Sequence, residues 1–298
     1  MCYNITKTRN KVVNIMSNII NAIINLVTDP KIKLREYSAG HNRANDMGKG
    51  LEEYIKDLFA GTVNETNEQI RNTALSNVFS YLGNQNNPPD AMLRGGDAIE
   101  VKKIESNGSS LALNSSYPKA KLFSDNPMIS ADCRTCEKWS VKDMIYTVGI
   151  VPNGSGVLSS LAMVYGDDYC ADKTVYEKIK TIIKNGVQSI PDVEFAETNE
   201  LGRVNHVDPL GITYLCVRGM WGIENPFAVF DYLFKRDFSK KFNFMCIINE
   251  DKWNTFDNTA ELLALLGQID GLAITDGQIK SPNNPAQLKN VKLITFVV

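Results

Sequence analysis

Residues 88–106, "PPDAMLRGGDAIEVKKIES", hold two short strand-like runs on either side of Arg94–Asp97. Two adjacent glycines between such runs are typical of a β-hairpin. Side chains alternate between the two faces of a strand, so Glu100 and Lys102 share one face and Ile99 lies on the other. The stretch therefore predicts a half-buried hairpin that carries charged groups on one face.

The hairpin brings acidic side chains near one another. If the turn closes at the two glycines, Asp90 lies opposite Val101 and diagonal to Glu100 and Lys102, with backbones about 7–8 Å apart. Two carboxylates and a main-chain carbonyl suit a hard cation such as Mg²⁺. A lysine beside that ion can orient a water or neutralise charge on a phosphate. A surface hairpin with a cross-strand ion pair, worth about 0–1 kcal/mol, fits the same residues.

Length and composition describe an ordinary globular chain. Its 298 residues are 43% hydrophobic and 22% charged, with a net charge of −2. A chain of this length can bury about three quarters of its unfolded surface. This net charge does not indicate a polyanion such as nucleic acid as a partner, although a catalytic groove needs only a local excess of basic residues.

The N-terminal region contains an apolar stretch, "VVNIMSNIINAIINLV", at residues 12–27. Four asparagines interrupt it, so it predicts an amphipathic helix and neither a signal peptide nor a membrane span. We expect a cytoplasmic protein with no membrane partner. Met16 is a second plausible start, so residues 1–15 are a possible N-terminal extension.

The six cysteines are expected to be reduced. Cys133 and Cys136 form the one close pair, and the chain's histidines are His41 and His206 alone. A zinc site needs a second pair or nearby histidines, so the sequence leaves the role of this pair open.

Helical and strand-like patterns alternate along the chain without a long linker or an internal repeat. The periodicity predicts helices at about 15–27, 45–59, 65–81, 172–185, 226–236 and 258–267. Strand-like runs occur at 144–151, 159–166, 212–219, 243–249 and 291–298. The pattern predicts an α/β fold, with a mixed central β-sheet flanked by helices.

Pro89-Asp90 followed by Glu100-Val101-Lys102 resembles the active-site signature of the PD-(D/E)xK nucleases, the superfamily of most type II restriction endonucleases. The chain is also similar to NgoPII-type restriction endonucleases in segments spread over residues 16–226. These segments are "NIINAIINLVTDPKIKLREYSAGHNRANDMG", "AIEVKKIES", "LALNSSYPKAKL" and "ETNELGRVNHVDPLGITYLCVRGMWGIENP". The resemblance implies a single restriction-endonuclease-like domain over 16–298, with DNA-recognition elements inserted around 105–140 and 198–226.

The resemblance also implies catalytic roles. Asp90 and Glu100 would hold Mg²⁺, with the Val101 carbonyl as a further ligand, and Lys102 would orient the attacking water. Such families often add an acid from an early helix. Glu52 is our candidate, although a solvated helix face that pairs Glu52 with Lys56 fits equally well.

Two stretches supply candidate DNA contacts. Residues 113–121 offer groups for bases or phosphates, although the stretch also fits a polar loop. Residues 201–222 offer groups that match base edges, although Asp208-Pro209 also fits a turn and Arg218 a strand-end charge. The candidates are Asn114, Ser115, Ser116, Lys119, Lys121, Arg203, Asn205, His206, Asp208, Arg218 and Trp221.

The resemblance implies Mg²⁺-dependent, sequence-specific hydrolysis of double-stranded DNA to 5′-phosphate and 3′-hydroxyl ends. The expected site is a short GC-rich palindrome, GGCC, which a homodimer reads most simply. A cognate DNA methyltransferase would be the genetic partner. Two alternatives remain: a structure-specific repair or recombination nuclease of the same superfamily, and a non-catalytic DNA-binding module.

Overall fold

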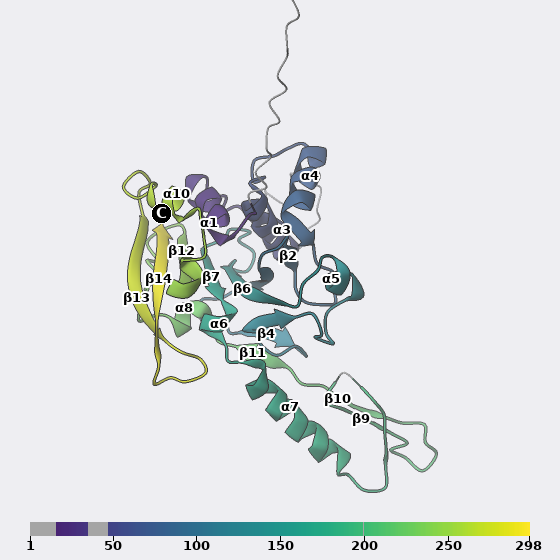
Figure 1. Ribbon diagram of the computed structural model, residues 1–298. Helices are drawn as coiled ribbons and strands as arrows, with labels where there is room; N and C mark the ends of the chain where they lie inside the picture. Colours follow the sequence, from purple (N-terminus) through teal and green to yellow (C-terminus); the bar gives the residue numbers. More distant parts are fainter. Residues whose placement is uncertain (1–15, 35–46, 199) are drawn as a thin grey trace, which may run out of the picture.

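The computed structural model describes residues 16–34, 47–198 and 200–298 (Figure 1). The possible extension at 1–15 and His41 lie outside these ranges. At the centre is a nine-stranded sheet, in the order β1-β2-β3-β6-β7-β12-β14-β13 with β5 beside β6. Its strands are β1 (Phe79–Tyr81), β2 (Ala91–Leu93), β3 (Ala98–Ile104), β5 (Lys121–Phe123), β6 (Val141–Ile150), β7 (Ser160–Tyr165), β12 (Asn243–Asn249), β13 (Leu272–Lys280) and β14 (Leu288–Val297).

The sheet is mixed, as the alternation of elements predicted. β3 runs parallel to β6, with Glu100 beside Tyr146, and β12 runs parallel to β7. The other pairings within the sheet are antiparallel. The parallel β3–β6 pair buries the hairpin strand in the sheet, with β2 as its other neighbour.

Helices cover one face of the sheet. They are α1 (Ile19–Thr28), α3 (Met47–Ala60), α4 (Glu68–Val78) and α10 (Thr259–Leu263) (Figure 1). α1 begins where the Asn18 side chain accepts hydrogen bonds from Ile20 N and Asn21 N, which satisfies amides left free in the first turn. Its apolar face joins alternate sheet residues such as Ile99 in one buried cluster.

Shorter elements cover the opposite face. They are α5 (Ala131–Thr135), α6 (Gly166–Tyr169), α8 (Pro226–Val229) and a small sheet of β4 (Leu111–Asn114) with β11 (Trp221–Ile223). Ala98 belongs to the buried cluster on this side, whereas Ile99 belongs to the first. The alternation expected for the hairpin strand is therefore confirmed, and the face of Ala98, Glu100 and Lys102 looks toward β4.

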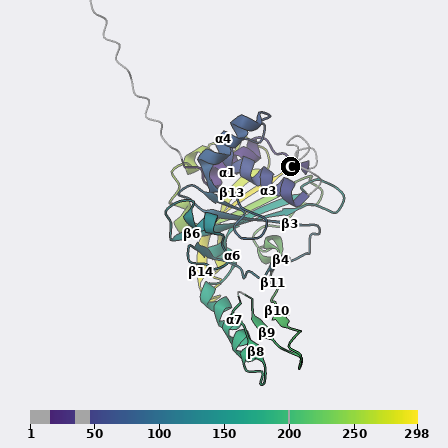
Figure 2. The ribbon, with the colours of Figure 1, turned by 90° about the vertical axis from the view of Figure 1, so that its right-hand side faces the viewer.

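An arm projects from the body of the molecule (Figures 1 and 2). It consists of α7 (Lys173–Gln188) and a three-stranded sheet of β8 (Glu194–Phe195), β9 (Gly202–Asn205) and β10 (Leu215–Val217). No described residue of α7 is buried, and Val175, Ile179 and Ile182 are about half exposed. The arm is thus a thin extension whose apolar side chains lack the cover found elsewhere.

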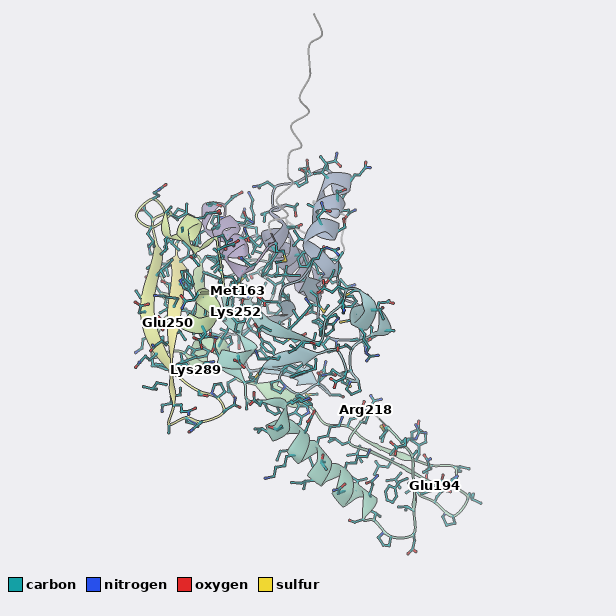
Figure 3. The ribbon with its side chains drawn as sticks, in the orientation of Figure 1. Met163, Glu194, Arg218, Glu250, Lys252 and Lys289 are labelled. Carbon is teal, nitrogen blue, oxygen red and sulfur yellow. The ribbon has the colours of Figure 1, made fainter. Side chains whose placement is uncertain are left out.

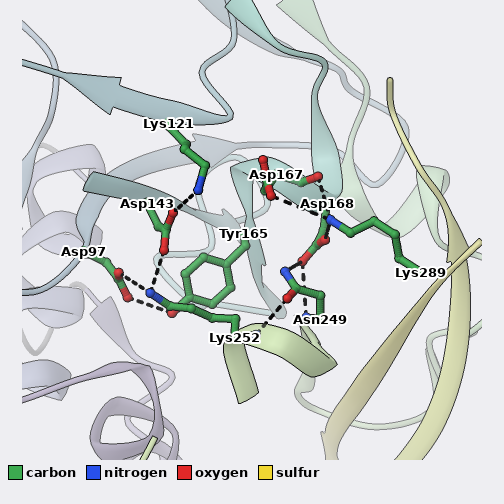
Figure 4. A network of polar contacts seen from close by, with 9 residues as sticks. All are labelled: Asp97, Lys121, Asp143, Tyr165, Asp167, Asp168, Asn249, Lys252 and Lys289. Atoms are coloured by element: carbon green, nitrogen blue, oxygen red, sulfur yellow. Dashed lines mark hydrogen bonds and ion pairs between the residues drawn. The ribbon is translucent and has the colours of Figure 1, made fainter. Parts of the chain in front are cut away.

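A polar network fastens the hairpin turn to the sheet (Figure 4). Lys252, on the short helix α9 (Glu250–Trp253), pairs with Asp97 and Asp143, each at 2.7 Å. The Tyr165 hydroxyl donates to the other Asp97 oxygen at 2.7 Å. Lys142 adds a hydrogen bond to the Gly96 carbonyl at 2.6 Å. The turn is therefore held by two lysines and a tyrosine hydroxyl from three other elements, α9, β6 and β7.

Three of the predicted helices are shorter in the structure, and strand β13 was missed. The helix predicted over 258–267 spans only Thr259–Leu263. The helix predicted over 65–81 ends at Val78, because Phe79–Tyr81 pairs with β2 instead. Of the helix predicted at 226–236, only Pro226–Val229 is α-helical. β13 was not predicted, since most of its side chains are half-buried or exposed at the edge of the sheet. Within the described ranges, no helix is both long and apolar enough to cross a lipid bilayer.

Candidate active site

The β2–β3 hairpin sets the geometry of the site. Its turn closes between Leu93 and Asp97, since Leu93 N donates to Asp97 O at 2.9 Å, so three residues form the loop instead of two. The register therefore shifts by one residue from our expectation, and Ala91 pairs with Ile99. Continuing that register places Asp90 beside Glu100 rather than opposite Val101. The Asp90 carboxylate accepts a hydrogen bond from Val101 N at 2.7 Å.

Lys102 and Glu100 form an ion pair on the same face of β3. Their Nζ and Oε1 atoms lie 2.7 Å apart, and both side chains are partly covered. Burial alone would lower the pKa of Lys102, but the carboxylates of Glu100 and Asp90 outweigh it and raise the pKa above its usual value. Lys102 is therefore an ammonium held by the two acids that the sequence singled out.

The surroundings of Asp90 disfavour the charged form of its carboxyl group. Burial, and then repulsion from Glu100, raise its pKa to about 7, against the opposing effects of Lys102 and Val101 N–H. Two carboxylates this close disfavour a second negative charge unless a cation joins them. A perturbed acid in a cleft is the pattern expected of a functional site.

The oxygen atoms here fit a magnesium ion. Glu100 Oε2 is buried with no hydrogen-bond partner, while Glu100 Oε1 forms the ion pair with Lys102 Nζ. Among the described residues, no three His, Cys, Asp or Glu side chains gather as a metal-ligand group. Mg²⁺ commonly binds through one or two carboxylates together with waters and substrate phosphates. The donor set therefore suits Mg²⁺, whereas a closed zinc site would need more ligands.

Glu52, on α3, belongs to the same electrostatic cluster. Its charge contributes to the pKa shifts of both Asp90 and Lys102. It also pairs with Lys56 at 2.5 Å, the helix-face contact that was the alternative reading. Its neighbour Glu53 is bound instead by the buried Arg71, at 2.7 Å. Of the two acids in "GLEEY", Glu52 is thus the one whose charge reaches the hairpin.

A cleft of about 310 Å³ opens at these groups. Its lining comes from the hairpin, the loop before it, the end of β4 and the root of the arm. The lining residues are Asn84, Gln85, Asn86, Asn87, Pro88, Asp90, Glu100, Lys102, Leu113, Asn114, Ser115, Ser116, Met128 and Glu200. Gly83 enters this loop with φ +79°, and a Cβ there would lie 2.3 Å from the Asp90 carbonyl oxygen. Only glycine lets the loop pass so close to Asp90.

The predicted contacts of residues 113–121 divide into two groups. Asn114, Ser115 and Ser116 line the cleft beside Glu100 and Lys102. Lys119 is 6% exposed, and its Nζ donates to Ser116 Oγ. Lys121 pairs with Asp143, its partner residue on the neighbouring strand β6, at 2.8 Å and does not line the cleft.

The predicted contacts in the arm have partners of their own. Arg203 donates to Asn205 Oδ1 at 3.0 Å, and its guanidinium lies 4.3 Å from the Tyr214 ring centre. His206 Nδ1 lies 2.6 Å from Glu194. Asp208 stabilises a turn by accepting hydrogen bonds from Leu210 N and Thr213 N, in agreement with the alternative prediction that Asp208-Pro209 forms a turn.

Two further candidates lie at the root of the arm. Arg218 is 74% exposed at its side chain and reaches Glu200 at 3.6 Å (Figure 3). Trp221 packs edge-on against the rings of Tyr117 and Tyr176, with centroids 6.2 and 5.6 Å away. Arg218 is therefore open to a ligand, whereas Trp221 ties β11 to α7 and to the β4 loop.

Sequence reasoning missed Glu200, which lines the cleft from the arm, and the burial of Lys119. No local signal marks either one. Both depend on contacts between segments far apart in the chain, such as Lys119 N with the Tyr146 hydroxyl at 2.7 Å.

A mixed sheet flanked by helices, with two carboxylates and a lysine converging in one cleft, defines a nuclease of the restriction-endonuclease class. The family model of the NgoPII restriction endonuclease matches residues 17–280. The type II restriction enzyme NgoPII of Neisseria gonorrhoeae is 60% identical over 279 residues, which cover 94% of this chain and 99% of that protein. No solved structure matches the chain. The chain belongs to the NgoPII restriction endonuclease family and is a site-specific deoxyribonuclease.

Proposed function

We propose that the enzyme hydrolyses double-stranded DNA at the palindrome GGCC, with Mg²⁺ as its cofactor, and leaves 5′-phosphate and 3′-hydroxyl ends. One observation carries this proposal: Asp90, Glu100 and Lys102 meet in a cleft where Glu100 Oε2 is buried without a partner. Membership of the NgoPII family favours this function over a repair nuclease or a non-catalytic binding module. We infer a cytoplasmic location, where incoming DNA would be met.

The chain's own groups have distinct tasks in this reaction. Asp90 and Glu100 would hold the ion, with the Val101 carbonyl as a further ligand and Glu52 supporting the cluster by its charge. When bound, the ion would stabilise negative charge on the scissile phosphate. Lys102 donates to Glu100 and would turn its remaining protons toward the attacking water and the phosphate, which fixes the water's direction of attack. Holding these groups in fixed positions, together with electrostatic stabilisation of the phosphate, would supply most of such catalysis.

The cleft and arm supply the proposed DNA contacts. Asn114, Ser115 and Ser116 would contact the strand being cut, because they line the cleft beside Lys102. Arg218 has the geometry to bind guanine O6 and N7 from the root of the arm. The insertions proposed around 105–140 and 198–226 carry these residues.

A homodimer would match the symmetry of a palindrome. The exposed apolar side chains on α7 are in keeping with this, since an uncovered stripe of this kind often marks an interface. A DNA methyltransferase is the proposed genetic partner, because host sites need protection from the enzyme.

The test is digestion of plasmids of known sequence with Mg²⁺, followed by sequencing of the fragment ends. Fragments that all end within GGCC support the proposal, and cleavage should stop when a chelator removes divalent ions. Discrete fragments at another sequence would contradict the specificity alone. Nicks at junctions or irregular structures would favour the repair alternative, and the absence of cleavage with any divalent ion would favour a binding module.

A further inference from the structure

Lys119 is a buried ammonium with few compensating charges. The residue is 6% exposed, and its Nζ donates to Ser116 Oγ and to the Tyr117 carbonyl. Throughout the described parts of the chain, no carboxylate forms an ion pair with it. Burial lowers the pKa of Lys119, as expected where water is excluded. Burying such a charge is costly unless it is paired with an opposite charge and hydrogen-bonded.

Its surroundings connect Lys119 to Glu100. The Lys119 backbone N–H donates to the Tyr146 hydroxyl at 2.7 Å, and Tyr146 lies beside Glu100 in the β3–β6 pair. Attraction by Glu100 and repulsion by Lys102 both act on the Lys119 ammonium. The charges of the two catalytic candidates on β3 therefore act on a second, buried lysine, which its contact with Tyr146 places near their strand.

A phosphate contact does not fit this position. An ammonium that neutralises DNA has to reach the backbone, as exposed lysines do. Lys119 is covered, and the hydroxyl that it binds belongs to Ser116, which itself lines the cleft. The ammonium lies behind the surface that DNA would touch.

We propose that Lys119 is a positioning residue for DNA cleavage: it fixes the Ser116–Tyr117 loop against the cleft and supplies a positive charge behind Glu100. The inference rests on the proposed cleavage function and assigns to Lys119 a task other than DNA binding. Two consequences separate this task from a simple packing role. The charge opposes cation binding at the carboxylates, and the ordered loop supports the rate of cleavage without adding affinity for DNA.

The experiment replaces the charge and keeps the side-chain length, with Lys119→Met in the full chain. Single-turnover cleavage at saturating Mg²⁺ should fall by about 100-fold, the effect of a small displacement of catalytic groups. Binding of Mn²⁺ to the DNA-free protein, followed by electron paramagnetic resonance, should tighten by about fivefold, because one nearby positive charge is gone. A general loss of structure would weaken Mn²⁺ binding, so this opposite sign identifies the electrostatic role.

DNA affinity provides the decisive contrast. Without divalent ions, the slope of log K against log salt should equal that of the wild type. A slope smaller by about 0.9 would show a direct phosphate contact and overturn the proposal. Lys103→Met is the matched control, because Lys103 pairs with Glu105 on the other face of β3, and all three measurements should stay at the wild-type values.

A second variant covers the case in which Lys119→Met does not fold. Ser116→Ala removes one hydrogen-bond partner and keeps the charge, so Mn²⁺ binding should stay unchanged while the rate at saturating DNA falls. Because Ser116 is also a proposed DNA contact, its DNA affinity is measured in parallel, and a rate loss that saturating DNA restores would count against the positioning role. An unaltered rate in either folded variant would overturn the proposal. Wild-type protein that fails to cleave DNA would instead refute the proposed function, so the two failures are distinguishable.

Discussion

The hairpin that carries the proposed catalytic residues and the arm are built in opposite ways. The hairpin is an inner part of the sheet, packed by apolar clusters on both faces and fastened at its turn by Lys142 and Lys252. In the arm, no described residue of α7 is buried, and several apolar side chains face solvent. The residues proposed for catalysis are therefore held in place by the core. The predicted recognition residues lie in or beside an arm whose helix has uncovered apolar side chains, where a ligand or a partner could bind.

Replacing Lys102 should give the largest effect. Lys102→Ala removes the only lysine that pairs with Glu100 among the described residues, and cleavage should fall by about 10³-fold, within the range for a proton-handling group. Single-turnover rates at saturating Mg²⁺ measure it. Lys103→Ala, one residue along the same strand, is the control and should stay near the wild-type rate. Equal losses in the two variants would show that the strand, and not the charge, matters.

The loop before the hairpin offers a test of rigidity in the core. Gly83→Ala would place a Cβ 2.3 Å from the Asp90 carbonyl at a positive φ, so the loop has to move Asp90. We expect cleavage to fall by about 100-fold and the free energy of unfolding by about 1–3 kcal/mol. Gly108→Ala is the control, because no atom lies within 4 Å of the added Cβ. A fully active Gly83→Ala enzyme would show that the core tolerates displacement.

The strained carboxyl of Asp90 predicts a pH dependence. Its pKa rises from 3.8 to about 7 on folding, so between these values the folded chain binds the proton more tightly than the unfolded chain. The free energy of unfolding should therefore fall as pH rises through this window, by at most about 1.4 kcal/mol per unit from this group. Urea unfolding in a chelator measures it, and Asp90→Asn should show a shallower fall. Identical slopes would refute the shift.

Arg218 tests the arm and should give the smallest effect. Arg218→Ala should weaken binding to cognate DNA by about 1–3 kcal/mol, the usual value of a bidentate contact with guanine. Competition binding without divalent ions should show little change on unrelated DNA. Arg218→Lys should not restore the loss, because lysine lacks the planar fork. An equal loss on both DNAs would indicate a phosphate contact.

Much of the core was visible in the sequence because its signals are local. The alternation around Glu100 predicted the two faces of β3, and the glycines predicted a hairpin. The exact register was not visible, since it depends on Leu93 closing the turn with Asp97. Glu52 was the candidate from the sequence, but the contact that holds its neighbour Glu53 was not visible, because Arg71 lies on another helix.

Predictions for the arm were weaker for a related reason. The strand-like pattern at 212–219 contains β10, but the pattern gives no sign that the strand lies outside the main sheet. Asp208 has the residue type for a base contact, yet its oxygens serve a local turn. In the sequence Lys119 has the pattern of a surface lysine, and its burial becomes visible only in the fold, where its backbone N–H contacts Tyr146 on β6. Long-range packing decides the placement of β10 and the burial of Lys119, which lies outside the arm, whereas a local turn decides the role of Asp208.

The aromatic rings of Tyr117, Tyr176 and Trp221 form a cluster that joins the cleft to the arm. It joins the loop beside the cleft to the first turns of α7 and to the strand that leaves the arm. Because these ring contacts join the loop, α7 and β11, they would fix the interval between the base that we propose for Arg218 and the bond that we propose is broken beside Lys102. Every target should then be severed at the same offset, whatever sequence flanks it.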